Sequence, residues 1–199
     1  MSPQELGRNY DSIAEEFRKQ RSRSVGLSYT REFSRMLQPS SLILDIGCGT
    51  GRPLARYLVD EGHRVRGIDI SGKMIEIVRH EIPEGMFEQG DILTWSSQLR
   101  FDGIIAWDSL FHLPLGSQHD ALEKICALLA PRGVALLTFG GKEGEIRSAM
   151  FGHEFYYSSL DRSTYESFFL SRGYSIILSE QDQPGEDHLV MIVQNIAKR

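Results

Sequence analysis

Residues 42–58 read LILDIGCGTGRPLARYL, and this stretch decides the fold that the sequence predicts. It passes from an apolar run at residues 42–46, through three glycines at alternate positions, into the helical spacing of Leu54 and Leu58. A continuous apolar run of this length is typical of a strand buried on both faces of a parallel sheet. Pro53 suits the first turn of a helix. The stretch therefore predicts a buried strand, a glycine-rich turn and a helix.

The same alternation continues along the chain. Further strands are predicted at residues 64–70, 86–89, 102–107, 134–139, 174–179 and 188–194. Helices are predicted at residues 2–23, 30–37, 119–129 and 163–172, and after an N-cap at Ser71. Strands separated by helices form a parallel sheet with right-handed crossovers. The short polar connection EQDQPGED at residues 180–187 permits only antiparallel pairing of the last two strands. We expect a doubly wound α/β sheet, mostly parallel, with an antiparallel edge.

The bulk composition is that of an ordinary globular protein. The 199 residues are 41% hydrophobic and 25% charged, which suits a single domain over residues 1–199. We expect an N-terminal helical segment and possible lid at residues 1–38 and a cofactor-binding core at residues 40–140. Residues 141–199 are expected to supply an acceptor-side loop, a helix and a terminal hairpin.

Charge and cysteine content restrict the partners. The net charge of −5 argues against a broad surface that binds nucleic acid or anionic membranes. The basic run at residues 18–23 is either a solvated helix end or a local site for nucleic acid. The two cysteines show no metal-ligand spacing, so no metal is expected, and they suit a reducing, cytoplasmic setting. No apolar run reaches the about 18 residues of a membrane span. The sequence does not predict the oligomeric state.

Three acidic residues, Asp45, Asp69 and Asp91, each follow or end one of three successive predicted strands. Ligands of such sheets bind beyond the carboxyl ends of the strands. Asp69 lies 20 residues after Gly49, where a carboxylate accepts hydrogen bonds from a ribose, and Asp91 is placed to accept from an adenine amino group. One such aspartate is more often a helix cap or a turn former. Three together predict a nucleoside site.

The charge of the predicted loop favours a cationic nucleoside. A dinucleotide fingerprint has a third glycine where this chain has Arg52, and clustered carboxylates repel a diphosphate. A nicotinamide-dependent oxidoreductase is therefore the disfavoured alternative.

Five motifs occur together in this order: LDIGCGTG, GIDIS, FEQGDIL, FDGIIAWDSLFHLP and LAPRGVALLTF. Over residues 40–140 they resemble the class I S-adenosylmethionine-dependent methyltransferases, and residues 157–176 resemble the tail of the small-molecule members. The resemblance implies a Rossmann-like, seven-stranded sheet whose last strand is antiparallel. It also implies S-adenosyl-L-methionine as cofactor and S-adenosyl-L-homocysteine as product.

The resemblance further implies cofactor contacts, residue by residue. The methionine part would lie against Asp45, Gly47, Gly49 and Gly51. Asp69 would contact the ribose, and Asp91 and the Ile92 backbone the adenine, with Cys48 and Ile70 also among the cofactor contacts. Ala106 and Trp107 would lie near the sulfonium, with Tyr10 of the segment NYDSIAEEF closing over the cofactor. For Trp107 and Tyr10, packing in the hydrophobic core is the alternative.

Acceptor-side residues are less constrained by the sequence. His112, five residues beyond Trp107, is the candidate general base, with a structural hydrogen-bonding role as the alternative. Tyr156 and Tyr157 fall in the connection between the fifth strand and the last helix, where they either line a substrate pocket or cap the core.

The sequence thus predicts an enzyme that transfers a methyl group from S-adenosylmethionine to a small-molecule acceptor. The chain carries no added recognition domain, broad basic composition or NPPY-like tetrapeptide after the predicted strand at residues 102–107, which disfavours an RNA methyltransferase. A non-catalytic module or partner subunit that binds S-adenosylmethionine or S-adenosylhomocysteine is the remaining alternative.

Overall fold

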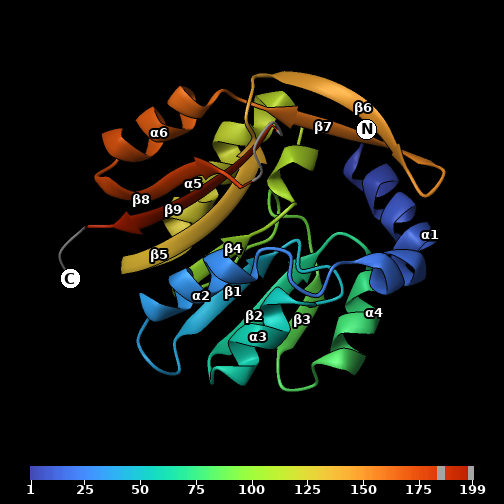
Figure 1. The fold of residues 1–199 in the computed structure, drawn as a ribbon, viewed down its shortest axis with the longest axis horizontal. Coiled ribbons are helices and arrows are strands. Elements are labelled where there is room, and N and C mark those ends of the chain that lie inside the picture. The colour runs from blue at the N-terminus through green and yellow to red at the C-terminus, as the bar shows by residue number, and fades with distance from the viewer. Residues whose placement is uncertain (183–186, 197–199) are drawn as a thin grey trace.

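The computed structural model describes residues 1–182 and 187–196 and centres on a seven-stranded sheet in the order β3-β2-β1-β4-β5-β9-β8 (Figure 1). The strands of this sheet are β1 (Leu42–Ile46), β2 (Arg64–Asp69), β3 (Met86–Gln89), β4 (Phe101–Ala106), β5 (Leu129–Gly140), β8 (Tyr174–Gln181) and β9 (His188–Asn195). β1 pairs in parallel with β2 and β4, so the strand that precedes the glycine turn is central. The predicted α/β fold class is confirmed.

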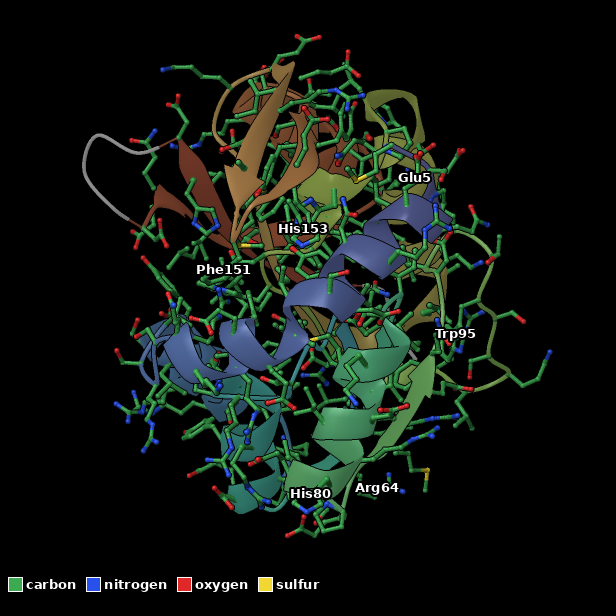
Figure 2. All side chains as sticks on the ribbon, turned by 90° about the vertical axis from the view of Figure 1, so that its right-hand side faces the viewer. Glu5, Arg64, His80, Trp95, Phe151 and His153 are labelled. Carbon is green, nitrogen blue, oxygen red and sulfur yellow. The ribbon has the colours of Figure 1, made fainter. Side chains whose placement is uncertain are left out.

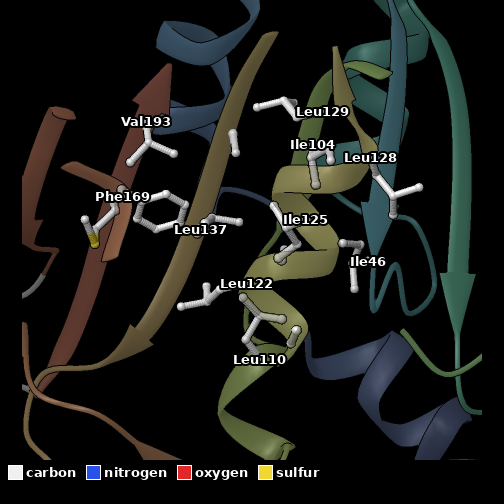
Figure 3. Close-up of a cluster of buried hydrophobic side chains, with 14 of the residues drawn as sticks. Ile46, Ile104, Leu110, Leu122, Ile125, Leu128, Leu129, Leu137, Phe169 and Val193 are labelled. Carbon is white, nitrogen blue, oxygen red and sulfur yellow. The ribbon is translucent and has the colours of Figure 1, made fainter. Parts of the chain in front are cut away.

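Helices cover both faces of the sheet. They are α1 (Pro3–Gln20), α2 (Leu27–Arg35), α3 (Leu54–Asp60), α4 (Gly72–Glu81), α5 (Gln118–Leu128) and α6 (Arg162–Ser171), with short 3-10 turns η1 (Leu110–His112) and η2 (Leu115–Ser117). Apolar side chains of α2, α3 and α4 form one buried cluster with β1 and β4. Those of α5 and α6 form the other, on the opposite face. Figure 3 shows this second cluster, in which Leu122 and Ile125 of α5 lie between Leu137 and Ile46.

The last two strands pair antiparallel at one edge of the sheet, as predicted, with β9 on the inner side of β8. β9 pairs antiparallel with both β5 and β8, so β8 is the edge strand and runs parallel to β5. The chain crosses by way of α6 to the outer position and then returns into the gap beside β5. The antiparallel pairing and the last strand's direction were predicted correctly, but the sequence carries no signal for their order. Of the predicted connection at residues 180–187, residues 183–186 lie outside the described part.

The segment predicted as an acceptor-side loop is instead a two-stranded sheet. β6 (Gly144–Met150) and β7 (His153–Ser159) form an antiparallel hairpin, whose turn has positive φ at Phe151 (50°) and Gly152 (79°). Two successive residues with positive φ give a turn whose backbone twist matches the right-handed twist of the flanking strands. β6 is exposed over nearly its whole length, so it lacks the alternating apolar pattern by which a half-buried strand is recognised.

β5 also begins earlier than predicted. The strand was predicted from residue 134, yet it already runs through residues 131–133, with a register shift opposite Phe101 and Gly103. Arg132 has a φ of 67° within this irregularity. The residues ahead of the predicted start therefore form a bulge within the strand.

α1 crosses the open end of the sheet. Figure 2 shows it running between the hairpin tip, marked by Phe151 and His153, and α4. Ile13 packs with Phe155 of β7, and Ala14 packs with Met74 and Ile77 of α4. In the described residues, no helix combines the length and apolarity that crossing a membrane requires.

Candidate functional site

A pocket of about 130 Å³ lies at the carboxyl ends of β1, β2 and β4, beneath α1. The strands contribute their last residues, the glycine turn forms one wall, and α1 contributes Leu6, Tyr10 and Phe17. This is the edge of a parallel sheet at which ligands bind. From β1 the sheet continues through β2 to β3 on one side and through β4 to β5 on the other. The pocket therefore lies at the point where the strand order reverses.

The glycine turn has the backbone conformation that the sequence predicts. Gly47, Gly49 and Gly51 have φ of 71°, 52° and 76°. A Cβ on Gly47 would lie 2.4 Å from Cβ of Ser109, so the packing of Ser109 leaves no room for a side chain at this position. A Cβ on Gly49 would meet nothing within 4 Å, although Gly49 lines the pocket. Gly49 therefore presents bare backbone to open space, where a ligand can approach closely.

Asp45, at the end of β1, is largely buried, and its carboxylate faces the pocket. Its side chain is 4% exposed, lines the pocket, and receives no hydrogen bond from any residue that the structure describes. Burial, together with the nearby charge of Asp69, raises its pKa to about 7. A buried carboxylate without a donor costs free energy unless a cation or hydrogen-bond donor reaches it. The pocket therefore favours a ligand that carries positive charge.

Asp69, at the end of β2, is held in place by backbone amides. Its two carboxylate oxygens accept hydrogen bonds from the N–H groups of Gly49 and Ser71, both at 2.8 Å. Burial raises its pKa to about 6 even though these amides act in the opposite direction. Each oxygen keeps a lone pair for a ligand hydroxyl. Asp91, after β3, accepts from the Leu93 N–H at 2.9 Å and also lines the pocket.

His112 joins three elements through its two ring nitrogens. Nδ1 lies 2.9 Å from the carbonyl oxygen of Tyr156 on β7, so Nδ1 carries the proton and donates. Nε2 is then the acceptor for the Tyr10 hydroxyl of α1, at 2.7 Å. Burial lowers the pKa of His112 to about 4, although the hydrogen bond to Tyr156 acts to raise it. The imidazole is therefore neutral at physiological pH.

A charged network beside Trp107 was not predicted from the sequence. Asp108, with a φ of 52°, accepts from Arg21 at 2.7 Å and from His188 of β9 at 2.9 Å. Burial alone would raise the pKa of Asp108, but the hydrogen bond from His188 and the charge of Arg21 hold it below its ordinary value. His188 also lies 2.9 Å from Asp182 at the end of β8. These residues are far apart in the chain, so no local pattern in the sequence indicates that they meet.

The structure brings most of the predicted site residues to this one pocket. Those that line it are Tyr10, Asp45, Gly47, Cys48, Gly49, Gly51, Asp69, Ile70, Asp91, Ile92, Trp107 and His112. Ala106 is fully buried and does not line the pocket. Tyr157 packs on His112 with ring centroids 4.7 Å apart, and Tyr156 bonds Glu145 and the Leu115 N–H, so these two tyrosines support the wall from behind. Among the described residues, no cluster of three His, Cys, Asp or Glu is arranged to hold a metal ion.

Comparison with known families matches residues 17–175 to a family described as a methyltransferase domain. The trans-aconitate 2-methyltransferase of Escherichia coli O1:K1 is 35% identical over 101 residues, covering 49% of this chain and 38% of that protein. The enzyme of that name from Paracidovorax citrulli is 31% identical over 106 residues, with the same coverage. The aligned part is thus well under half the length of these relatives.

Two solved structures share the whole fold at low sequence identity. The 1,6-didemethyltoxoflavin-N1-methyltransferase of Burkholderia thailandensis, solved with S-adenosylhomocysteine, superimposes with a TM-score of 0.73 at 19% identity and covers 99% of this chain and 92% of its own. DhpI in complex with S-adenosylhomocysteine gives a TM-score of 0.75 at 19% identity and 98% coverage of both chains. The chain belongs to the methyltransferase-domain family, and its fold is the one that the resemblance to class I S-adenosylmethionine-dependent methyltransferases implied.

Proposed function

We propose that this chain is an S-adenosylmethionine-dependent methyltransferase that methylates a small-molecule acceptor and releases S-adenosylhomocysteine. The observation that carries the proposal is Asp45, a buried carboxylate that faces the pocket without a hydrogen-bond donor from the described chain. It lies beside the bare backbone of Gly49 and close enough to Asp69 to feel its charge.

The residues present fit this cofactor. Asp45 would accept from the ammonium group of the methionine part, and Asp69 from the ribose hydroxyls. Asp91 and the backbone of Ile92 would contact the adenine, and Gly49 leaves room for the ligand against the main chain. Charge-assisted hydrogen bonds of this kind are among the stronger contacts in proteins. When bound, the cofactor supplies an activated methyl group on a positively charged sulfur.

The remaining pocket residues would exclude water and orient the acceptor. Tyr10, Phe17 and Trp107 give this side of the pocket aromatic walls, and such faces suit a cationic sulfur. Aligning the acceptor in line with the methyl group lowers the barrier by fixing the reacting atoms in a productive geometry.

For His112 we propose a positioning role in place of the predicted general base. A base works best when its pKa lies near the working pH, and burial lowers that of His112 to about 4. Its hydrogen bond to Tyr10 instead fixes α1 over the pocket. The direct substrate contacts predicted for Tyr156 and Tyr157 remain predictions.

We propose that residues 1–38 include a lid formed by α1. Ligand pockets are usually about 300–1,000 Å³, and the present pocket is smaller at about 130 Å³. Entry of a nucleoside therefore requires α1 to move. The docked helix is held by Asp11, which accepts from the Ser71 hydroxyl at 2.6 Å and the Lys73 N–H at 2.9 Å. Asn9 also donates to the Glu154 carbonyl at 2.8 Å.

A small acceptor is supported by the names of the relatives, which refer to trans-aconitate and to 1,6-didemethyltoxoflavin. The part of the chain shared with the trans-aconitate enzymes covers half of this chain, so it does not identify the acceptor. Both cysteines are free, in keeping with a reducing, cytoplasmic setting.

The test is turnover. The purified chain is incubated with S-adenosylmethionine and a panel of small carboxylic acids, amines and heterocycles, and release of S-adenosylhomocysteine is measured. At least one acceptor class should give turnover that Asp69→Ala lowers strongly at sub-saturating S-adenosylmethionine. Tight cofactor binding with no turnover across a broad panel would favour the non-catalytic binding module, and turnover with RNA alone would favour an RNA methyltransferase.

A further inference from the structure

A second cavity, of about 680 Å³, opens beside the mouth of the cofactor pocket, and we call it the basic groove. It lies between the C-terminal end of α1 and the start of α3. Six cationic side chains line it, against two acidic ones: Arg18, Lys19, Arg21, Arg23, Arg52 and Arg56, against Asp60 and Glu81. The chain as a whole carries a net charge of −5, so this excess of positive charge is local.

The protein's own carboxylates neutralise only part of this charge. Glu81 is shared by Arg18 at 3.1 Å and Arg52 at 2.8 Å. Arg56 pairs with Asp60 at 2.6 Å and Glu84 at 3.2 Å, and Arg21 pairs with Asp108 at 2.7 Å, so four of the six cations already have a carboxylate partner. Lys19 and Arg23 are exposed and form no ion pair within residues 1–182 and 187–196.

We propose that the basic groove is a binding site for a small oxyanion with two or more negative charges, such as a phosphate ester or a polycarboxylate. Guanidinium groups match the oxygen geometry of both phosphate and carboxylate, and Lys19 adds a compact point charge. The hydroxyl groups of Ser22 and Thr50 also line the groove and can donate to such a ligand.

The surroundings of the basic groove favour a small ligand over a nucleic acid. Exposed acidic residues adjoin its lining: Glu15 pairs with Arg18, Glu84 with Arg56, and Asp60 belongs to the lining itself. An extended polyanion would meet these negative charges. Proteins that bind single-stranded nucleic acids also supply aromatic side chains on which the bases stack. Tyr57 is the aromatic residue among the described lining, and its ring already lies under the Arg31 guanidinium.

The basic groove and the cofactor pocket are contiguous, since Arg21, Thr50, Arg52 and Pro53 line both. The proposed anion must therefore be distinguished from the cofactor's own carboxylate. Its binding does not depend on methyl transfer, so the proposal can be tested without an acceptor.

The test is calorimetry of the full chain with inorganic pyrophosphate and, separately, citrate, each with and without saturating S-adenosylhomocysteine. We expect saturable binding of one equivalent, retained in the presence of S-adenosylhomocysteine. The double variant Lys19→Gln/Arg23→Gln should weaken binding about tenfold or more. Comparison of the two probes shows whether phosphate or carboxylate is preferred.

A matched control removes the same charge elsewhere. Arg35, at the end of α2, and Arg100, just before β4, are exposed and lie toward the amino ends of the strands. Arg35→Gln/Arg100→Gln should bind pyrophosphate like the wild type. Thermal unfolding of both variants checks the fold, and Arg23→Gln alone provides a second variant if the double substitution destabilises the chain.

Several results would overturn the proposal. These are no binding of either probe, an equal loss of affinity in the two double variants, or complete displacement of the probe by S-adenosylhomocysteine. Tighter binding of a short single-stranded RNA through Lys19 and Arg23 would assign the basic groove to nucleic acid instead. Failure of S-adenosylhomocysteine to bind at all would count against the proposed methyltransferase function, while the cofactor-free titrations would still test the groove.

Discussion

Replacing Asp45 with asparagine should stabilise the free protein above pH 7 and weaken its binding of S-adenosylmethionine. The carboxylate is buried at the end of β1, and burial together with the charge of Asp69 raises its pKa from 3.8 to about 7. In the free protein the ionised carboxylate is therefore a source of instability. In the complex the same charge attracts the cationic ligand.

The sign of the pH dependence follows from this raised pKa. Below the ordinary value of 3.8, the carboxyl group of Asp45 is neutral in the folded and the unfolded chain. As the pH rises from there to about 7, the unfolded chain loses the proton first, so the stability of the folded wild type falls. Above about pH 7 the penalty is complete, and at pH 4 it is nearly absent.

The magnitude follows from the same difference. The gap between 3.8 and about 7 corresponds to at most about 4 kcal/mol. The asparagine amide would itself lack partners, at a cost of about 1–3 kcal/mol. We therefore expect Asp45→Asn to raise the free energy of unfolding by about 1–3 kcal/mol at pH 8. Each kcal/mol corresponds to about 2–4 °C in melting temperature for a chain of this size.

The assay is thermal unfolding of wild type and Asp45→Asn from pH 4 to pH 8, without ligand. The melting temperature of the variant should exceed that of the wild type at pH 8, and this advantage should vanish or reverse near pH 4. Saturating S-adenosylmethionine should stabilise the wild type more than the variant. A variant that is destabilised equally at every pH would refute the reasoning, because Asp45 would then act by packing and not through its charge.

Three further predictions concern the pocket. Asp69→Ala should weaken S-adenosylmethionine binding by the loss of charge-assisted hydrogen bonds of about 1.5–3 kcal/mol each, and unchanged affinity in a folded variant would remove the ribose assignment. Gly51→Ala should destabilise the fold more than Gly49→Ala: both residues have positive φ, so both substitutions strain the backbone, but only the Cβ at Gly51 would also lie 2.5 Å from the Val78 side chain. Gly49→Ala should in addition weaken ligand binding because its Cβ points into open space, and equal melting temperatures for the two variants would contradict this. Tyr10→Phe removes the hydroxyl that donates a hydrogen bond to His112. It should therefore accelerate dissociation of S-adenosylhomocysteine in stopped-flow measurements, while the melting temperature stays within a few °C of the wild type. An unaltered dissociation rate would argue against α1 as a lid.

Local chemistry explains why the cofactor half of the site could be predicted. The segment at residues 42–58 contains a strand, a turn that needs positive φ and a helix start, and each leaves its own signal in neighbouring residues. Asp69 follows at the end of the next strand, and parallel strands bring their carboxyl ends to the same edge. Sequence order alone therefore places these groups together.

The side of the pocket that we propose for the acceptor depends on contacts between distant residues, for which the sequence gives no local signal. Asp108 meets Arg21 of the N-terminal segment and His188 of β9, which lie 87 and 80 residues away. The exposed β6 strand has no alternating pattern, so the hairpin beside α1 was predicted as a loop. The position of β9 between β5 and β8 likewise follows from how the chain returns to the sheet and not from any residue in β9.

Calorimetric titration of the full chain with S-adenosylmethionine at pH 8 addresses the central claim most directly. The pocket built by Asp45, Gly49 and Asp69 should give saturable heat for one equivalent of ligand, and this heat should diminish as the pH is lowered below about 6, where both carboxylates take up protons. No heat at millimolar ligand, from a chain that still unfolds cooperatively, would contradict the account.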